Sequence, residues 1–269
     1  MESGIKRAGI AHRLLMLLLM IYLLLPLLAT CIYAFAQEWQ TTVLPERWTL
    51  EWFGEMFRDL RFLESLWTSL YLCLISVAIS LIVMLPAVFV ITVYLPKWES
   101  FMKGLVVLPY AVPGVVAAVG LIRAYSSGPL EIAGTAYILI GAYFVVVLPY
   151  MYQGIRNSLL TVSAGPLLAA AELLGASRTR AFASVILPNI WPGVLVSSLL
   201  SFSVLFGEFV LTNMLVGGQI QTIQVYLYHR VGESGHLASA IAITYFVFIL
   251  LLSALLMKLG QKMNGGLKG

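Results

Sequence analysis

The stretch AAAELLGASRTRAFASVILPNIWPGV, residues 169–194, is polar and turn-forming in a chain that is otherwise strongly apolar. It begins with strong helix formers, and Gly175 can end that helix or allow a tight turn. Ser177 can cap a second short helix that contains two arginines, and Pro188 fits a helix start or a break. We therefore predict two short helices with a bend. From these residues alone, the stretch is either a binding segment that another molecule recognises or a surface linker that returns the chain to the membrane.

Composition indicates an integral membrane protein. Of the 269 residues, 61% are hydrophobic and 10% are charged, whereas a soluble domain carries about 25% charged residues. The formal net charge of +4 is explained by basic loops that set the topology, so no nucleic-acid partner is expected. The two cysteines lie in apolar runs and the three histidines are scattered, which predicts neither a disulfide framework nor a metal site.

Long apolar runs predict the membrane spans, because crossing a bilayer needs about 20 residues and the backbone must satisfy its own hydrogen bonds there. The six runs lie at about 14–37, 66–95, 104–122, 132–155, 189–215 and 237–257. The first run is interpreted as a retained helix, since it exceeds the roughly 7–15 residues of a signal-peptide core. We expect an all-α integral membrane protein with six transmembrane helices in a single domain, residues 1–269.

The distribution of basic residues predicts that both termini are cytoplasmic, because cytoplasmic loops carry an excess of Lys and Arg. With this orientation, eleven of the sixteen basic residues lie inside: Lys6, Arg7, Arg13, Lys97, Lys103, Arg156, Arg178, Arg180, Lys258, Lys262 and Lys268. The longest inner loop is then about 157–188. The outer segment 38–64 combines tryptophans and phenylalanines with charges, which predicts a short helix at the membrane interface.

Polar residues are too sparse in the spans to suggest catalysis. The sequence contains no Walker A pattern, no zinc-type His-Glu-x-x-His and no Gly-x-Ser-x-Gly, so an enzyme is not expected. Glu208 is the only acidic residue well inside a predicted span. Its carboxylate can face a water-filled path or cap a neighbouring helix, and the sequence leaves both roles open. A single carboxylate without internal repeats argues against a proton-coupled secondary carrier.

The segment at 169–188 resembles the cytoplasmic signature loop of ATP-binding-cassette (ABC) importer permeases. The family pattern is Glu-Ala-Ala, three residues, Gly, nine residues, Ile, one residue, Leu-Pro. Here Val185 replaces the isoleucine, and Ala169 stands where the family has glutamate, with Glu172 three residues later near the same helix face. By this resemblance, the residues expected in the ATPase-coupling loop are Ala170, Ala171, Glu172, Gly175, Ala176, Ser177, Arg178, Val185, Leu187 and Pro188.

The resemblance implies a type I ABC importer (MetI-like) permease fold in a multi-pass protein of the bacterial cytoplasmic (inner) membrane. In that family the signature loop docks on separate ABC ATPase subunits, which hydrolyse ATP, so this chain itself is expected to bind no cofactor. The family also implies a second homologous permease chain, with a heterodimer as the expected arrangement, and a periplasmic or extracellular solute-binding protein.

Two further stretches, 101–121 and 201–218, resemble the third and fifth spans of these permeases. The candidate residues of the translocation path are Tyr110, Pro113, Gly114, Glu208 and Asn213. Aromatic rings and a carboxylate suit an amine-bearing cation, although Tyr110 can equally be a packing residue. The second permease subunit of spermidine/putrescine-type importers resembles the chain most, which implies a small polar solute such as a polyamine. Phosphonate or ferric iron import and a stand-alone secondary transporter are the alternatives.

Overall fold

The computed structural model describes residues 2–39 and 42–265, and Lys268 of the topology count lies outside them. Within the described chain, five helices are long and apolar enough to cross a membrane, and the number is six when one bent helix pair is counted as a single span. This count agrees with the six predicted runs. The chain divides into two compact units, one with the N-terminal part up to Phe62 and Leu227–Phe248, the other with Leu63–Tyr226 and the part from Ile249.

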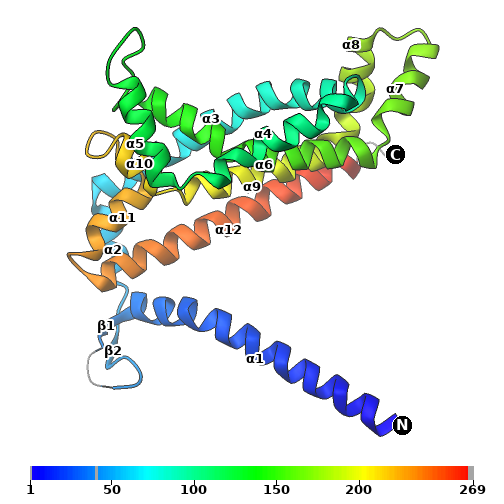
Figure 1. The fold of residues 1–269 in the computed structure, drawn as a ribbon. Helices are drawn as coiled ribbons and strands as arrows, with labels where there is room; N and C mark the ends of the chain where they lie inside the picture. The colour runs from blue at the N-terminus through cyan, green and yellow to red at the C-terminus, as the bar shows by residue number, and fades with distance from the viewer. Residues whose placement is uncertain (1, 40–41, 266–269) are drawn as a thin grey trace. The chain divides into compact units, whose positions relative to one another are not determined.

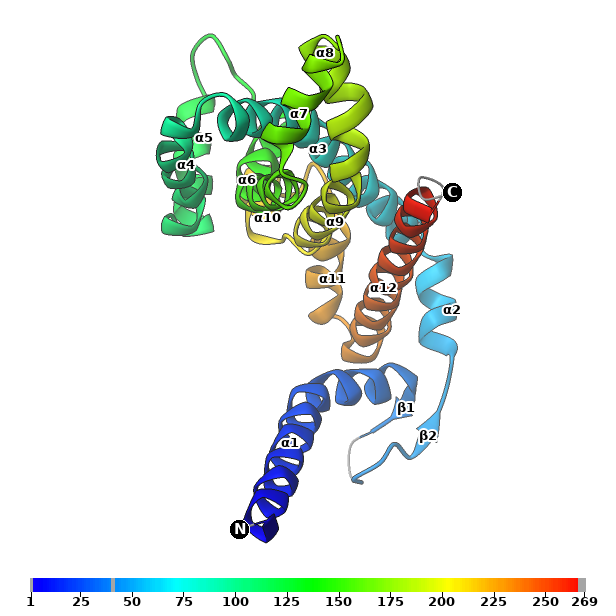
Figure 2. The ribbon, with the colours of Figure 1, turned by 90° about the vertical axis from the view of Figure 1, so that its right-hand side faces the viewer.

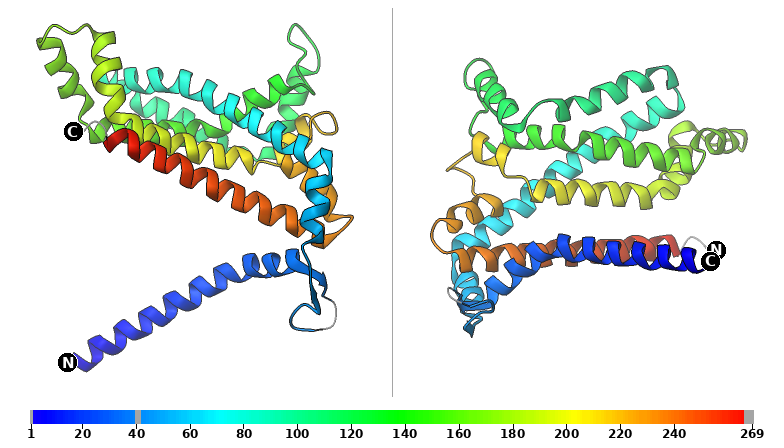
Figure 3. Two further views of the ribbon diagram at one scale, coloured as in Figure 1. Left: turned by 180° about the vertical axis from the view of Figure 1, so that it is seen from behind. Right: turned by 60° about the horizontal axis from the view of Figure 1, so that its bottom comes forward.

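The first unit contains a small β-hairpin that the sequence did not predict. Its elements are α1 (Glu2–Phe35), β1 (Ala36–Glu38), β2 (Arg47–Trp48), α2 (Glu51–Arg58) and the first part of α12 (Gly235–Gly265). The two strands pair antiparallel between α1 and α2, as Figure 3 shows. Helix α2 is the short helix predicted within 38–64. The expected first span, 14–37, corresponds to α1, which ends two residues earlier because the chain then enters β1.

Aromatic stacking holds this unit together at the end of α1. The imidazole of His236 stacks between the rings of Tyr33 and Trp52, with centroid distances of 3.9 and 5.5 Å. Its Nδ1 lies 3.0 Å from the carbonyl oxygen of Tyr33. Arg230 adds an ion pair with Asp59. The aromatic contacts join α1 and α2 to the start of α12, and the ion pair joins α11 (Ile223–Val231) to the residue that follows α2.

The second unit carries most of the apolar helices. Its elements are α3 (Leu60–Val93, which begins in the first unit), the 3-10 turn η1 (Pro96–Trp98), α4 (Glu99–Ala111), α5 (Gly114–Tyr125), α6 (Ala136–Thr161), α7 (Ala164–Leu173), α8 (Arg178–Ala181), the π-helical turn η2 (Phe182–Ile186), α9 (Leu187–Phe206), α10 (Val210–Leu215) and the start of α11 (Ile223–Val231). Helices α6 and α9 lie side by side (Figures 1 and 2). Beyond one end of this pair stand α7 and α8, which connect the two helices.

The α6–α9 contact is close because both helices present small residues at a spacing of four. Gly154 and Ser158 on α6 face Ser197 and Gly193 on α9. A Cβ atom on Gly154 would lie 2.2 Å from Cβ of Ser197, and one on Gly193 would lie 1.8 Å from Oγ of Ser158. Each serine hydroxyl donates to the glycine carbonyl one turn earlier, at 2.7 and 3.1 Å. Small residues at this spacing let helix backbones approach in a membrane, so we infer that the two stems of the α7–α8 connection behave as one body.

Replacing Gly154 by valine is therefore expected to destabilise the chain by about 1–3 kcal/mol, the usual cost of overpacking a tight contact. The matched control is Gly141→Val on the same helix, where an added Cβ meets nothing within 4 Å. Thermal unfolding in detergent should show a clear loss for Gly154→Val and little change for the control. Equal losses in both variants would show that helix propensity, and not the close contact, determines the effect.

The third expected span, 104–122, consists of two helices. The segment Pro96–Ala111 and α5 meet at an angle of 98°. Val112 is extended, with φ −106° and ψ 118°, because the ring of Pro113 disfavours the helical conformation in the residue before it. Pro113 then precedes the first residue of α5. The expected span is therefore broken at Val112 and Pro113 and consists of two helices.

The fifth expected span, 189–215, is wrong as a continuous helix. Helix α9 ends at Phe206, and α10 is a separate helix of six residues. The backbone N–H groups of Leu211 and Thr212 donate to the carboxylate of Glu208. A side chain has thus replaced the carbonyl groups that a continuous helix would supply, and a new helix begins.

The remaining spans differ from expectation mainly at their ends. The run 66–95 becomes α3, the run 132–155 becomes α6, and the run 237–257 lies within α12. Since α6 continues to Thr161 and α9 begins at Leu187, the connection between these two helices is residues 162–186, which lie within the expected loop 157–188. We call residues 162–186 the α7–α8 segment.

Candidate functional site

Helix α7 ends in the turn that the sequence predicted at Gly175. Gly175 has φ +88°, a backbone conformation that favours glycine because it has no Cβ. Its N–H donates to the carbonyl of Glu172 at 2.9 Å, and the N–H of Ala176 donates to the carbonyl of Ala171 at 3.1 Å. This pair of hydrogen bonds is the Schellman arrangement that closes helix C-termini. The turn therefore has a defined shape.

The second short helix also begins as expected. Ser177 is its N-cap, and its hydroxyl accepts from the N–H of Arg180 at 3.4 Å. The helix then continues through the π-helical turn into α9, with Pro188 in the first turn of α9. A proline cannot donate a backbone hydrogen bond, and it is tolerated in a first turn. The chain thus passes from α8 through the π-helical turn into the apolar helix α9 without a loop between them.

The tip of the α7–α8 segment is apolar, which the sequence reasoning missed. Leu173 and Leu174 are each 90% exposed, the highest exposure of any leucine among the described exposed hydrophobic residues. They stand at the end of α7, directly before the Gly175 turn. Their position in the sequence could have indicated this exposure. Two leucines at a helix end, directly before a tight turn, have no neighbouring core in which to pack. Exposed apolar side chains at a defined turn form a candidate contact surface.

The residues expected in the coupling loop gather in this segment and the first turn of α9. Ala171 is buried, Glu172 pairs with Arg178, and the distance between Glu172 Oε1 and Arg178 Nε is 3.3 Å. Exposed members are Ala170, Glu172, Gly175, Ser177 and Arg178, and half-buried members are Ala176, Val185, Leu187 and Pro188. The Glu172 carboxylate thus forms an ion pair within its own chain, and this pair links α7 to α8.

The candidate path residues separate into two places. Gly114 opens α5 against α10, where an added Cβ would lie 3.6 Å from Cγ1 of Val210, and half-buried Asn213 lies on α10. Tyr110 instead sits on α4 with its ring 6.2 Å from that of Tyr150 on α6, edge to face. The structure therefore brings the α5 and α10 residues together and gives Tyr110 a different neighbour.

Glu208 caps α10, which is one of the two roles that the sequence left open. Its Oε1 accepts from the N–H of Leu211 at 2.7 Å, and its Oε2 accepts from the N–H and the hydroxyl of Thr212, both at 3.0 Å. The Thr212 hydroxyl also lies 2.6 Å from the hydroxyl of Tyr143 on α6. A negative charge at a helix N-terminus is favourable because the free N–H groups and the helix dipole point toward it.

Removing this cap by Glu208→Ala is expected to cost about 1–2 kcal/mol of stability, as for other N-terminal caps. Glu208→Gln retains an acceptor oxygen and should lose less. Thermal unfolding of the two variants in detergent measures the difference, and transport by the glutamine variant is the second measurement. If Glu208→Gln melts like the parent chain but does not transport, the negative charge itself acts in the path.

Comparison with known proteins identifies the family. The model of the family "Binding-protein-dependent transport system inner membrane component" matches residues 92–265. Over 257 residues the chain is 27% identical to the putative 2-aminoethylphosphonate transport system permease protein PhnV of Salmonella typhimurium, covering 96% of this chain and 94% of that protein. The spermidine/putrescine transport system permease protein PotB of Haemophilus influenzae is 26% identical over 187 residues, 64% of this chain and 65% of that protein.

A solved structure shares the fold. A chain from a bacterial ABC transporter involved in the import of the acidic polysaccharide alginate superposes with a TM-score of 0.73 at 14% identity, covering 94% of this chain and 96% of that chain. This likeness and the family match confirm the predicted fold class and agree with a permease, not an enzyme. The chain belongs to the binding-protein-dependent transport system inner membrane components, and it is a multi-pass inner-membrane permease of an ABC importer.

Proposed function

We propose that the chain forms half of a translocation pathway and couples to a separate ATPase through the α7–α8 segment. The observation that carries the proposal is the exposed tip at Leu173 and Leu174. The fixed turn at Gly175 presents these side chains at the end of α7. Exposed apolar side chains at a defined turn are typical of a protein–protein contact. The sequence has no phosphate-binding loop of its own, so ATP is hydrolysed by the partner and this chain binds no cofactor.

Coupling follows from how the segment is connected. Its two stems, α6 and α9, are locked by the glycine–serine contact between them. When the ATPase subunits close on ATP, a docked α7–α8 segment moves with them, and the α6–α9 pair moves as a rigid body. ATP binding then biases a two-state equilibrium between an inward-open and an outward-open pathway.

The proposal includes two further protein partners. A second homologous permease chain lines the other half of the pathway, and we expect a heterodimer. A solute-binding protein delivers substrate on the outer side of the membrane. The family description names this dependence on a binding protein, which argues against the alternative of a stand-alone secondary transporter.

We propose a small amine-bearing solute as the substrate. The relative that covers 96% of the chain is described as a permease for 2-aminoethylphosphonate. The second candidate is a polyamine, favoured by the spermidine/putrescine relative that covers 64% of the chain. Both solutes carry an ammonium group, which aromatic faces attract. Because Glu208 is used as a helix cap, the tyrosine pair Tyr110 and Tyr150 is the better candidate to meet it.

Reconstitution tests the proposal. The chain is expressed with an ATPase, a second permease and a solute-binding protein from the same genome, purified through a tag on this chain, and placed in proteoliposomes. The ATPase should copurify, and uptake of labelled 2-aminoethylphosphonate or spermidine should require both ATP and the binding protein. Uptake by this chain alone would overturn the coupling proposal. If ATP-dependent uptake is observed for neither solute, only the proposed substrate class, a small amine-bearing solute, is overturned.

A further inference from the structure

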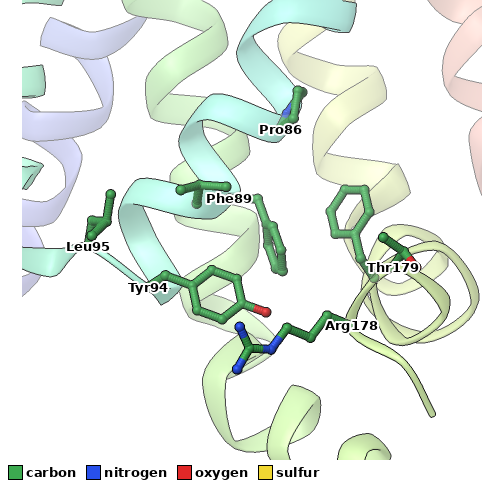
Figure 4. Close-up of a pocket in the computed structure, with 8 residues that line it drawn as sticks. Pro86, Phe89, Tyr94, Leu95, Arg178 and Thr179 are labelled. Atoms are coloured by element: carbon green, nitrogen blue, oxygen red, sulfur yellow. The ribbon is translucent and has the colours of Figure 1, made fainter.

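Arg178, the first residue of α8, reaches across to the end of α3. Its guanidinium carbon lies 5.4 Å from the centre of the Tyr94 ring, and Figure 4 shows the two side chains pointing toward each other. Tyr94 directly follows α3, and its N–H still donates to the carbonyl of Val90. The same guanidinium pairs with Glu172 on α7. Arg178 therefore connects α7, α8 and the end of α3, although α3 lies far away in the sequence.

An aromatic contact one turn later supports the same connection. The ring of Phe182 lies 4.4 Å from that of Phe89 on α3, and Phe89 meets Tyr94 edge to face at 5.8 Å. Phe89 is buried. These residues line a groove of about 550 Å³ between α3 and α8, which Pro86 borders (Figure 4). The lining of the groove is mostly apolar, and its polar members are Arg178, Thr179 and the hydroxyl of Tyr94. Ring packing and one cation therefore hold the contact.

We propose that Arg178 is a positioning residue that ties the α7–α8 segment to α3. The inference rests on the proposed coupling function and deepens it. A pull on the segment then moves α3 together with α6 and α9. The Arg178 side chain is already engaged within its own chain, by Glu172 and by the ring of Tyr94. A planar guanidinium can pair with a carboxylate and lie against a ring at the same time, and a lysine ammonium does this poorly.

Arg180 offers a matched comparison. It lies two residues further on in the same short helix and is exposed, so it carries the same charge. Residues two apart on a helix point in nearly opposite directions, which directs Arg180 away from Tyr94. If charge alone matters, the two arginines are equivalent. If the contact with Tyr94 matters, only Arg178 depends on that ring.

The experiment is a double-mutant cycle in the reconstituted importer, measured as solute transported per ATP hydrolysed. Arg178→Ala and Tyr94→Ala should each lower this ratio several-fold, and the double variant should be no worse than either. Tyr94→Phe should retain the ratio because the ring face remains, and Arg178→Lys should not. The pair Arg180→Ala and Tyr94→Ala should show independent effects. In all variants the ATPase should still copurify.

Additive effects of Arg178→Ala and Tyr94→Ala would overturn the proposal. Loss of ATPase copurification in Arg178→Ala but not in Tyr94→Ala would also overturn it, by placing the arginine at the ATPase. The same cycle on the melting temperature of the isolated chain in detergent tests the contact without any partner. If the unaltered chain fails to retain an ATPase, the proposed coupling function fails, whereas a non-additive melting cycle would still show that Arg178 holds α3.

Discussion

The double variant Leu173→Asp, Leu174→Asp is expected to abolish stable assembly with the ATPase and, with it, transport. Burying one leucine side chain is worth about 1.5–3 kcal/mol, so losing two costs about 3–6 kcal/mol, and the two carboxylates add a desolvation penalty. Since about 1.4 kcal/mol is a factor of ten in affinity, the Kd for the ATPase should rise at least about 100-fold. Copurification and titration of the purified ATPase onto the chain in detergent measure this change.

The chain's own fold should not suffer from this change. Side chains that are 90% exposed contribute almost nothing to the packing of their own chain, so the melting temperature should stay close to that of the parent. Leu130→Asp is the control. Leu130 is also exposed, but it lies in the connection before α6 and not beside the Gly175 turn. Normal ATPase binding by the double variant, or an equal loss in Leu130→Asp, would show that the tip is not the docking surface.

The membrane spans and the Gly175 turn could be predicted because each depends on local properties of the chain. A run of about 20 apolar residues is long enough to span the bilayer wherever it occurs. A glycine after a helix-forming run favours the left-handed conformation that closes a helix. The break at Pro113 is similarly local, because proline restricts its own φ and the conformation of the residue before it.

The features that the sequence missed or left open depend on how the chain is folded. Whether Glu208 caps a helix depends on whether nearby N–H groups are free, and that is known only once α9 ends at Phe206. The contact of Arg178 with Tyr94 needs α3 and α8 to lie side by side. The pairing of β1 with β2 involves only five residues, too few for a periodic pattern to appear. A sequence pattern therefore located the α7–α8 segment but not its contacts with α3.

Replacing Gly175 by valine is expected to uncouple ATP hydrolysis from transport. A residue with a Cβ at φ +88° is strained, by roughly 1–2 kcal/mol for the left-handed conformation and more for a β-branched side chain. The chain relieves that strain by opening the turn, which redirects the leucine tip relative to α8. We expect the ATPase to hydrolyse ATP while transport per ATP falls about tenfold or more, and simultaneous assays of phosphate release and solute uptake measure the ratio.

Two companion variants separate the turn from side-chain size. Gly175→Asn should transport better than the valine variant, since asparagine adopts the left-handed conformation more readily than other residues with a Cβ. Gly165→Val adds the same side chain at the start of α7, where an added Cβ meets nothing within 4 Å and φ is not positive, and it should retain coupling. An opened turn and a surface blocked by a larger side chain would both lower transport per ATP, so the three variants must be compared. We expect transport per ATP to be highest in Gly165→Val, lower in Gly175→Asn and lowest in Gly175→Val. If Gly175→Val transports as much solute per ATP as the parent chain, binding of the ATPase to this segment does not depend on the shape of the turn.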